Sequence, residues 1–88
     1  MKLIFAIIKD EDNESVSKAL TKENFRVTLI ASTGGFLRSG RSTLLIGVDD
    51  DQVDKALDVI RKSCQKPEKL DEKRATIFVL KVDKFTQL

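Results

Sequence analysis

The fold is decided by residues 26–48, which read RVTLIASTGGFLRSGRSTLLIGV. The segments Arg26–Ser32 and Ser42–Val48 are rich in β-branched and aliphatic residues, which is typical of strands. Between them lies the loop Thr33–Arg41, which holds three of the chain's four glycines. This stretch therefore predicts two consecutive strands joined by a glycine-rich loop.

The segments before this stretch predict a strand followed by a helix. Residues Lys2–Ile8 are apolar almost throughout, as in a strand buried on both faces or at a subunit contact. Turn and cap residues follow at Asp10–Asn13, and a helix is expected from Glu14. Its apolar positions have the helical spacing of three and four: Val16, Ala19 and Leu20. The helix should end near Glu23–Asn24, with Asn24 as a left-handed cap.

The segments after Val48 predict a helix followed by a strand. Asp49–Asp51 are expected to cap a second helix through their side chains. Its apolar stripe consists of Val53, Ala56, Leu57, Ile60 and Cys64. A charged connector, Lys62–Arg74, contains the only proline and leads to a last strand, Ala75–Val82, and a short tail, Asp83–Leu88. Cys64 is accordingly expected to be a small core residue rather than a nucleophile.

The element order β-α-β-β-α-β predicts an α+β, ferredoxin-like domain spanning residues 1–88. Two helices would cover one face of a four-stranded antiparallel sheet. Both alternation phases of the first and last strands are apolar, so another subunit is expected to cover the other face. A small core without disulfide or metal also favours an oligomer.

Composition excludes several function classes. The net charge is only +2, which argues against a nucleic-acid-coating protein, and no apolar run reaches the roughly 18–20 residues of a membrane span. The apolar run Met1–Ile8 is short and is followed by charged residues rather than by a signal-peptide cleavage site. The absence of histidine and the single cysteine exclude disulfides, Cys/His zinc sites and histidine catalysis, and favour the cytoplasm. Asp49–Asp51 lack the spacing of a calcium loop, so no metal is expected.

The loop Thr33–Arg41 and its neighbours carry the candidate chemistry. Consecutive glycines, hydroxyl groups and two arginines suit a phosphate ligand, although a solvated hairpin loop explains the same residues. Phe36 can stack on a base or pack into a nearby core. Gly47 marks either a β-bulge or a position where a ligand or another backbone segment approaches the strand closely. Asn24, Arg26 and Thr28 alternate and can share one face, where they either recognise a ligand or serve as a cap and edge-strand residues.

Short motifs along nearly the whole chain carry a family resemblance. They are Met1–Ile4 with Ala6-Ile7, Asn24–Thr28, Thr33–Leu37, Ser39-Gly40, Ile46–Val48 and Ala75–Leu80. In these motifs the chain resembles the PII-like cyclic di-AMP receptor family. The resemblance implies a bacterial, cytoplasmic, non-enzymatic homotrimer that binds cyclic di-AMP between subunits, needs no cofactor, and signals to an unidentified downstream protein through loop rearrangement.

The resemblance also implies which residues bind the ligand. They are Asn24, Arg26, Thr28, Gly35, Phe36, Leu37 and Gly47, with Gln87 matching a glutamine near the family's C-terminus. The backbone of Gly34–Leu37 would hold ligand groups, and Phe36 would pack against an adenine. Two departures stand out: Arg41 replaces a small polar residue, and the connector Lys62–Arg74 is much shorter than the family's loop.

Three other functions are compatible with this sequence. The short connector keeps open a PII-like sensor of ATP, ADP or another nucleotide. An acylphosphatase-like enzyme would need a phosphate loop after the first strand, where the acidic Asp10–Asp12 would repel phosphate. A trimer without any ligand is the third possibility, and the polar alternation at Asn24, Arg26 and Thr28 argues against it.

Overall fold

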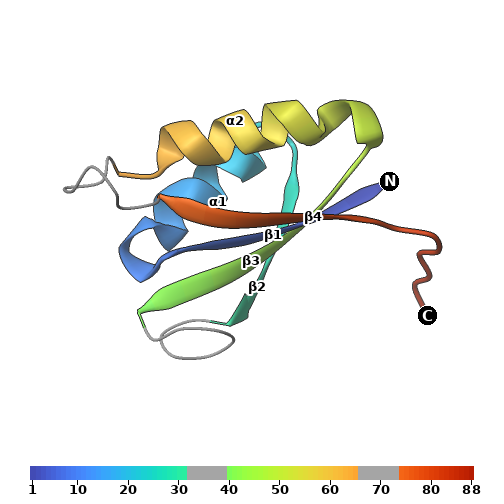
Figure 1. The fold of residues 1–88 in the computed structure, drawn as a ribbon, viewed down its shortest axis with the longest axis horizontal. Coiled ribbons are helices and arrows are strands. Elements are labelled where there is room, and N and C mark those ends of the chain that lie inside the picture. Colours follow the sequence, from blue (N-terminus) through green and yellow to red (C-terminus); the bar gives the residue numbers. More distant parts are fainter. Residues whose placement is uncertain (32–39, 66–73) are drawn as a thin grey trace.

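The computed structural model describes residues 1–31, 40–65 and 74–88 of the chain. Within these residues it contains four strands, two α-helices and two short 3-10 turns (Figure 1). Their order is β1 (Lys2–Lys9), η1 (Asp10–Asp12), α1 (Asn13–Lys22), β2 (Arg26–Ala31), β3 (Arg41–Val48), η2 (Asp50–Gln52), α2 (Val53–Ser63) and β4 (Ala75–Lys81). This is the predicted β-α-β-β-α-β order.

The strands form one antiparallel sheet in the order β2-β3-β1-β4. Strand β1 is central, with Phe5 opposite Leu45 of β3 and Phe78 of β4. Figure 1 shows both helices on the same side of this sheet. The architecture is therefore a small α+β fold consistent with the predicted ferredoxin-like plan, with β2 and β4 at the two edges.

The core lies between the helices and one face of the sheet. Alternate residues of β1 and β3 point into it because side chains in a strand alternate between the two faces. The buried cluster consists of Ile4, Ala6, Ile8, Leu44, Ile46 and Val48 from the sheet, and Val16, Leu20, Ala56, Ile60 and Cys64 from the helices and their ends. The apolar helical stripes predicted from the sequence, including Cys64 as a core residue, are confirmed except at Ala19, which is half-buried and outside the cluster.

Helix α1 ends in a Schellman motif that sets the direction of β2. Asn24 has a φ of 69°, the left-handed conformation predicted for it. The N–H of Asn24 donates to the carbonyl of Thr21 at 2.9 Å, and that of Phe25 donates to the carbonyl of Leu20 at 3.0 Å. Phe25 packs against the core cluster. Because side chains alternate along an extended chain, the next residue, Arg26, faces away from the helices.

The acidic residues before the helices do not cap them as predicted. Neither α1 nor α2 has a side-chain cap hydrogen bond, because each begins from a 3-10 turn. In η2 the carbonyl of Asp49 accepts the N–H of Gln52 at 2.9 Å, while Asp50 pairs with the Met1 ammonium at 2.9 Å. In η1 the buried Asp12 accepts the N–H of Gln65 at 3.2 Å. These carboxylates therefore bind other segments rather than helix N–H groups.

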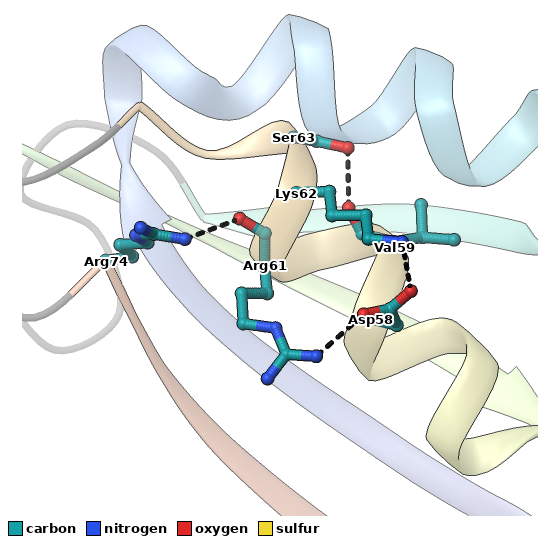
Figure 2. Close-up of polar contacts among 6 residues, drawn as sticks. All are labelled: Asp58, Val59, Arg61, Lys62, Ser63 and Arg74. Atoms are coloured by element: carbon teal, nitrogen blue, oxygen red, sulfur yellow. Dashed lines mark hydrogen bonds and ion pairs between the residues drawn. The ribbon is translucent and has the colours of Figure 1, made fainter.

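The C-terminal part of α2 is held by local polar contacts, and the predicted connector begins later than expected (Figure 2). Lys62 and Ser63 belong to α2. Asp58 pairs with Lys62 at 2.9 Å and Arg61 at 2.7 Å, which together lower its pKa. Arg74 donates to the carbonyl of Arg61 at 3.2 Å. Gln65 accordingly donates its N–H to Asp12, so both Gln65 and Arg74 are anchored to the folded chain.

Candidate functional site

The sheet face opposite the helices carries a continuous apolar surface, called here the open face. Its members follow from strand alternation and register: Leu3, Phe5, Leu45, Phe78 and Leu80. Ile7 lies on the same side of β1 but is buried. At the β4 edge the side chains are strongly exposed, Phe78 to 50% and Leu80 to 48%. This confirms that the first and last strands carry apolar residues on both faces, as the sequence pattern predicted.

Polar residues of β2 lie on the same open face, beside the apolar surface. Arg26 is directly opposite Gly47 of β3, which is in turn opposite Leu3 of β1. One residue pair further along this face, Thr28 is opposite Leu45. Arg26 and Thr28 therefore share one face, as predicted, and the polar edge runs without interruption into the apolar rows.

An open pocket of about 540 Å³ lies at the end of the sheet where β1 and β2 begin and β3 ends. It is lined by Met1, Glu23, Asn24, Phe25, Arg26, Gly47, Val48, Asp49, Gln52 and Lys55. The pocket thus brings together three residues that the sequence singled out: Asn24 from the α1 cap, Arg26 from β2 and Gly47 from β3. Asn24 and Arg26 lie two residues apart at the turn into β2, and the pairing of β2 with β3 adds Gly47 to them.

The other predicted site residues lie elsewhere or outside the description. Thr28 is next to the pocket on the open face but does not line it. Gly35, Phe36 and Leu37 fall within 32–39, outside the described residues. Gln87 is exposed in the tail that follows β4 and is not part of the lining.

The pocket is lined by both acidic and basic side chains, and among the described residues Arg26 is a basic residue without a partner. Lys55 lies 3.6 Å from a carboxylate oxygen of Glu23 and 6.0 Å from the centre of the Phe25 ring. In the part of the chain that the structure describes, the side chain of Arg26 has no hydrogen-bond or ion-pair partner, and it is exposed. Its guanidinium is therefore available to donate several hydrogen bonds to an anionic or carbonyl-bearing ligand.

Gly47 does not mark a bulge, and the end of the Met1 side chain lies close to it. The β-ladder runs in register through Gly47 on both sides, and among the described strands the register shifts only between Leu29 and Ala31 of β2. A Cβ atom on Gly47 would lie 3.1 Å from Cε of Met1. The bulge interpretation is therefore wrong, and the missing side chain makes room on the open face.

Several lining residues carry no signal in the sequence. Gln52 ends η2 and Lys55 lies in the first turn of α2, and in the sequence both look like ordinary surface residues. Met1 precedes the first strand and approaches Gly47 only because β1 pairs with β3. Knowledge of the sheet register was needed to find them, although the capping role of Asn24 already indicated the turn that forms this corner.

The described residues contain neither a cluster that could hold a metal ion nor a helix that could cross a membrane. Among residues 1–31, 40–65 and 74–88, no group of three Cys, Asp or Glu side chains is placed to hold a metal ion. In the same residues no helix is long and apolar enough to cross a membrane.

The buried Cys64 thiol gives a direct test of the packing around α2. Burial and the nearby Asp12 raise the pKa of Cys64 from 9.0 to about 11, because both disfavour the thiolate. We expect Ellman's reagent at pH 8 to modify the thiol far more slowly in the native protein than in guanidinium chloride. Since the unfolded thiol ionises first, Cys64 should also make unfolding easier as the pH rises from about 9 to 11. Equal modification rates in the two states would contradict this packing.

Comparisons with known proteins cover most or nearly all of the chain. A family model described as "Cyclic-di-AMP receptor" matches residues 1–74. A functionally unknown protein from Pediococcus pentosaceus ATCC 25745, whose crystal structure is known, is 34% identical in sequence and superposes with a TM-score of 0.81. That similarity covers 99% of this chain and 96% of the other. The family match includes every lining residue of the pocket and ends before β4 begins.

Proposed function

This chain belongs to the cyclic-di-AMP receptor family, and on that premise we propose that it is a homotrimeric second-messenger receptor that binds cyclic di-AMP between neighbouring subunits. The family is one of receptors, so signal transduction by nucleotide binding is its role. The homotrimer, the location of the ligand and the output are our proposals. The observation that carries them is the row Arg26, Gly47, Leu3 and Leu80 across the open face.

The open face supports the proposed assembly. Large apolar side chains such as Phe78 and Leu80 remain about half exposed in a single chain, which costs free energy in water. Contiguous exposed apolar surfaces of this kind mark interaction sites. A chain of 88 residues buries a modest share of its surface alone, and packing three open faces together would add to its core. A homotrimer of single-domain chains, residues 1–88, would both cover the exposed apolar surface and enlarge the buried core.

The same row supports a ligand site at the subunit boundary. Arg26 and Thr28 occupy the edge strand β2, at the polar margin of the apolar surface. A neighbour that covers the apolar part would come up to this margin and turn the open pocket into an enclosed site. Enclosure matters because hydrogen bonds and charge interactions with a ligand are stronger where water is excluded.

The chemistry of the pocket suits a cyclic dinucleotide with two phosphates and two adenines. The guanidinium of Arg26 can bind a phosphate through paired hydrogen bonds. The Asn24 amide can pair with the edge of an adenine. Gly35, Phe36 and Leu37 are proposed to supply backbone donors and a stacking ring, and Thr28 and Gln87 further polar contacts. Ligand binding would then change the arrangement of the loops that a downstream protein reads.

This receptor is proposed to act in the bacterial cytoplasm without a cofactor and without catalysing a reaction. A PII-like sensor of ATP or ADP remains the second candidate, because the segment between α2 and β4 is short and its ends at Gln65 and Arg74 are anchored. Such a segment offers less chain for a ligand-responsive loop than the family resemblance implies.

A calorimetric titration tests the function directly. We expect cyclic di-AMP to bind with one ligand per chain, and cyclic di-GMP and ATP to bind at least about tenfold more weakly, because mismatched polar groups in a site are left unpaired. The control is the same titration after thermal unfolding. Tighter binding of ATP would establish the alternative sensor, and no binding of any of the three nucleotides would contradict both functions.

A further inference from the structure

The side chain of Met1 forms part of the wall of the candidate site. Met1 lines the pocket together with Arg26 and Gly47. Its Cε atom lies where it would be 3.1 Å from a Cβ on Gly47. Leu3 pairs with Gly47, and Met1, two residues before Leu3, faces the same side of the sheet. The thioether therefore lies over the backbone of Gly47 on the open face.

The backbone of Met1 is held by two polar contacts, whereas its side chain is half-exposed. The Met1 carbonyl accepts the N–H of Val82 at 3.1 Å, and its ammonium lies 2.9 Å from Oδ1 of Asp50. The ammonium is the leading cause of a lowered pKa at Asp50, which keeps that carboxylate ionised. Met1 nevertheless stays 48% exposed. The residue thus holds an adaptable thioether at a fixed point beside the pocket.

We propose that Met1 is a ligand-contacting residue of the nucleotide site and packs its thioether against an adenine ring above Gly47. The proposal rests on the proposed function. The missing Gly47 side chain is the reason a flat ring can approach the sheet here, but Met1 Cε already occupies the edge of that space. An arriving ring must therefore displace the thioether or pack against it. Packing is favoured because methionine sulfur makes attractive contacts with aromatic rings and its side chain adapts readily.

The chain offers a spectroscopic readout of this contact. Met1 is the only methionine, so a sample labelled with methyl-13C methionine gives one methyl signal that reports on the space above Gly47. We expect cyclic di-AMP to move this signal in proportion to site occupancy, through the ring current of the adjacent base. Cyclic di-GMP, added at the same concentration, should leave it in place.

A matched pair of variants measures what the contact contributes. Met1→Ala and Met1→Leu are produced by cleaving a leader directly before residue 1, so both keep the ammonium that pairs with Asp50. Met1→Ala should bind cyclic di-AMP about two- to tenfold more weakly, the range for a sulfur–aromatic contact, whereas Met1→Leu should stay near the unchanged chain. Thermal unfolding should be similar for both, because the side chain is outside the core cluster.

The outcomes separate this inference from the function on which it rests. An unmoved methyl signal in a sample that calorimetry shows to be saturated would overturn the role of Met1 and leave the receptor function standing. Unchanged affinity of Met1→Ala would do the same. Absence of calorimetric binding by the unchanged chain would instead overturn the proposed function itself.

Discussion

Replacing Phe78 with glutamate should dissociate the proposed homotrimer. Phe78 is 50% exposed in the middle of β4, and its row across the open face continues through Phe5 and Leu45 to Thr28. Burying such a ring contributes about 1.5–3 kcal/mol per chain, and burying an unpaired carboxylate in its place costs several kcal/mol more. Light scattering should give three times the 9.9 kDa chain mass for the unchanged protein and a single chain mass for Phe78→Glu.

The consequence for binding distinguishes an interface site from a site within one chain. Phe78 is three strands from Thr28 and does not line the pocket, so only loss of the neighbouring subunit would weaken cyclic di-AMP binding in Phe78→Glu. Phe85→Glu is the matched control, because Phe85 is exposed in the tail after β4 and should leave the mass unchanged. Circular dichroism checks that both variants fold. A trimeric Phe78→Glu, or a monomeric unchanged chain, would contradict the assembly.

The fold was largely predictable because its signals are local and mutually consistent. The apolar run Lys2–Ile8 predicted a strand, and the helical spacing of Ala56 and Ile60 predicted the apolar stripe that is the buried side of α2. The left-handed cap at Asn24 needed only the knowledge that asparagine tolerates positive φ. These patterns depend on neighbouring residues along the chain, so the sequence carries them without any tertiary information.

The helix starts were predicted less well because the same residue types have competing uses. Carboxylates before a helix commonly cap its N–H groups, and that prediction failed at both helices. Asp12 instead accepts the N–H of Gln65, and Asp50 instead pairs with Met1, across distances in sequence that no local pattern encodes. A 3-10 turn leaves these side chains free to do so.

The site was predictable only in part, because the tertiary structure brings some of its residues together from distant segments. Arg26 and Asn24 were found from composition, alternation and a family resemblance, and the fold does bring them together with Gly47. Met1 and Lys55 can be assigned to the pocket only from the pairing of β1 with β3 and from the position of α2. Residues that line a site by pairing of distant segments leave no motif in the sequence.

Replacing Arg26 with alanine should produce the largest loss of binding from a single side chain. In the described residues its guanidinium has no partner, and it faces the pocket at the polar margin of the open face. A hydrogen bond to a charged group contributes about 1.5–3 kcal/mol, so cyclic di-AMP should bind about 10- to 150-fold more weakly to Arg26→Ala. Folding and chain mass should be preserved, because Arg26 is exposed in the single chain and outside the core.

Two further variants separate hydrogen bonding from simple charge. Arg26→Lys keeps the charge but loses the planar pair of donors, so its affinity should fall between those of Arg26→Ala and the unchanged chain. Arg61→Ala removes the same charge from α2, where Arg61 pairs with Asp58 and does not line the pocket, and it should bind normally. An equal loss of affinity in Arg61→Ala would show that the effect of Arg26→Ala comes from net charge alone. Unchanged affinity of Arg26→Ala would show that the ligand does not bind at the corner formed by β2 and β3.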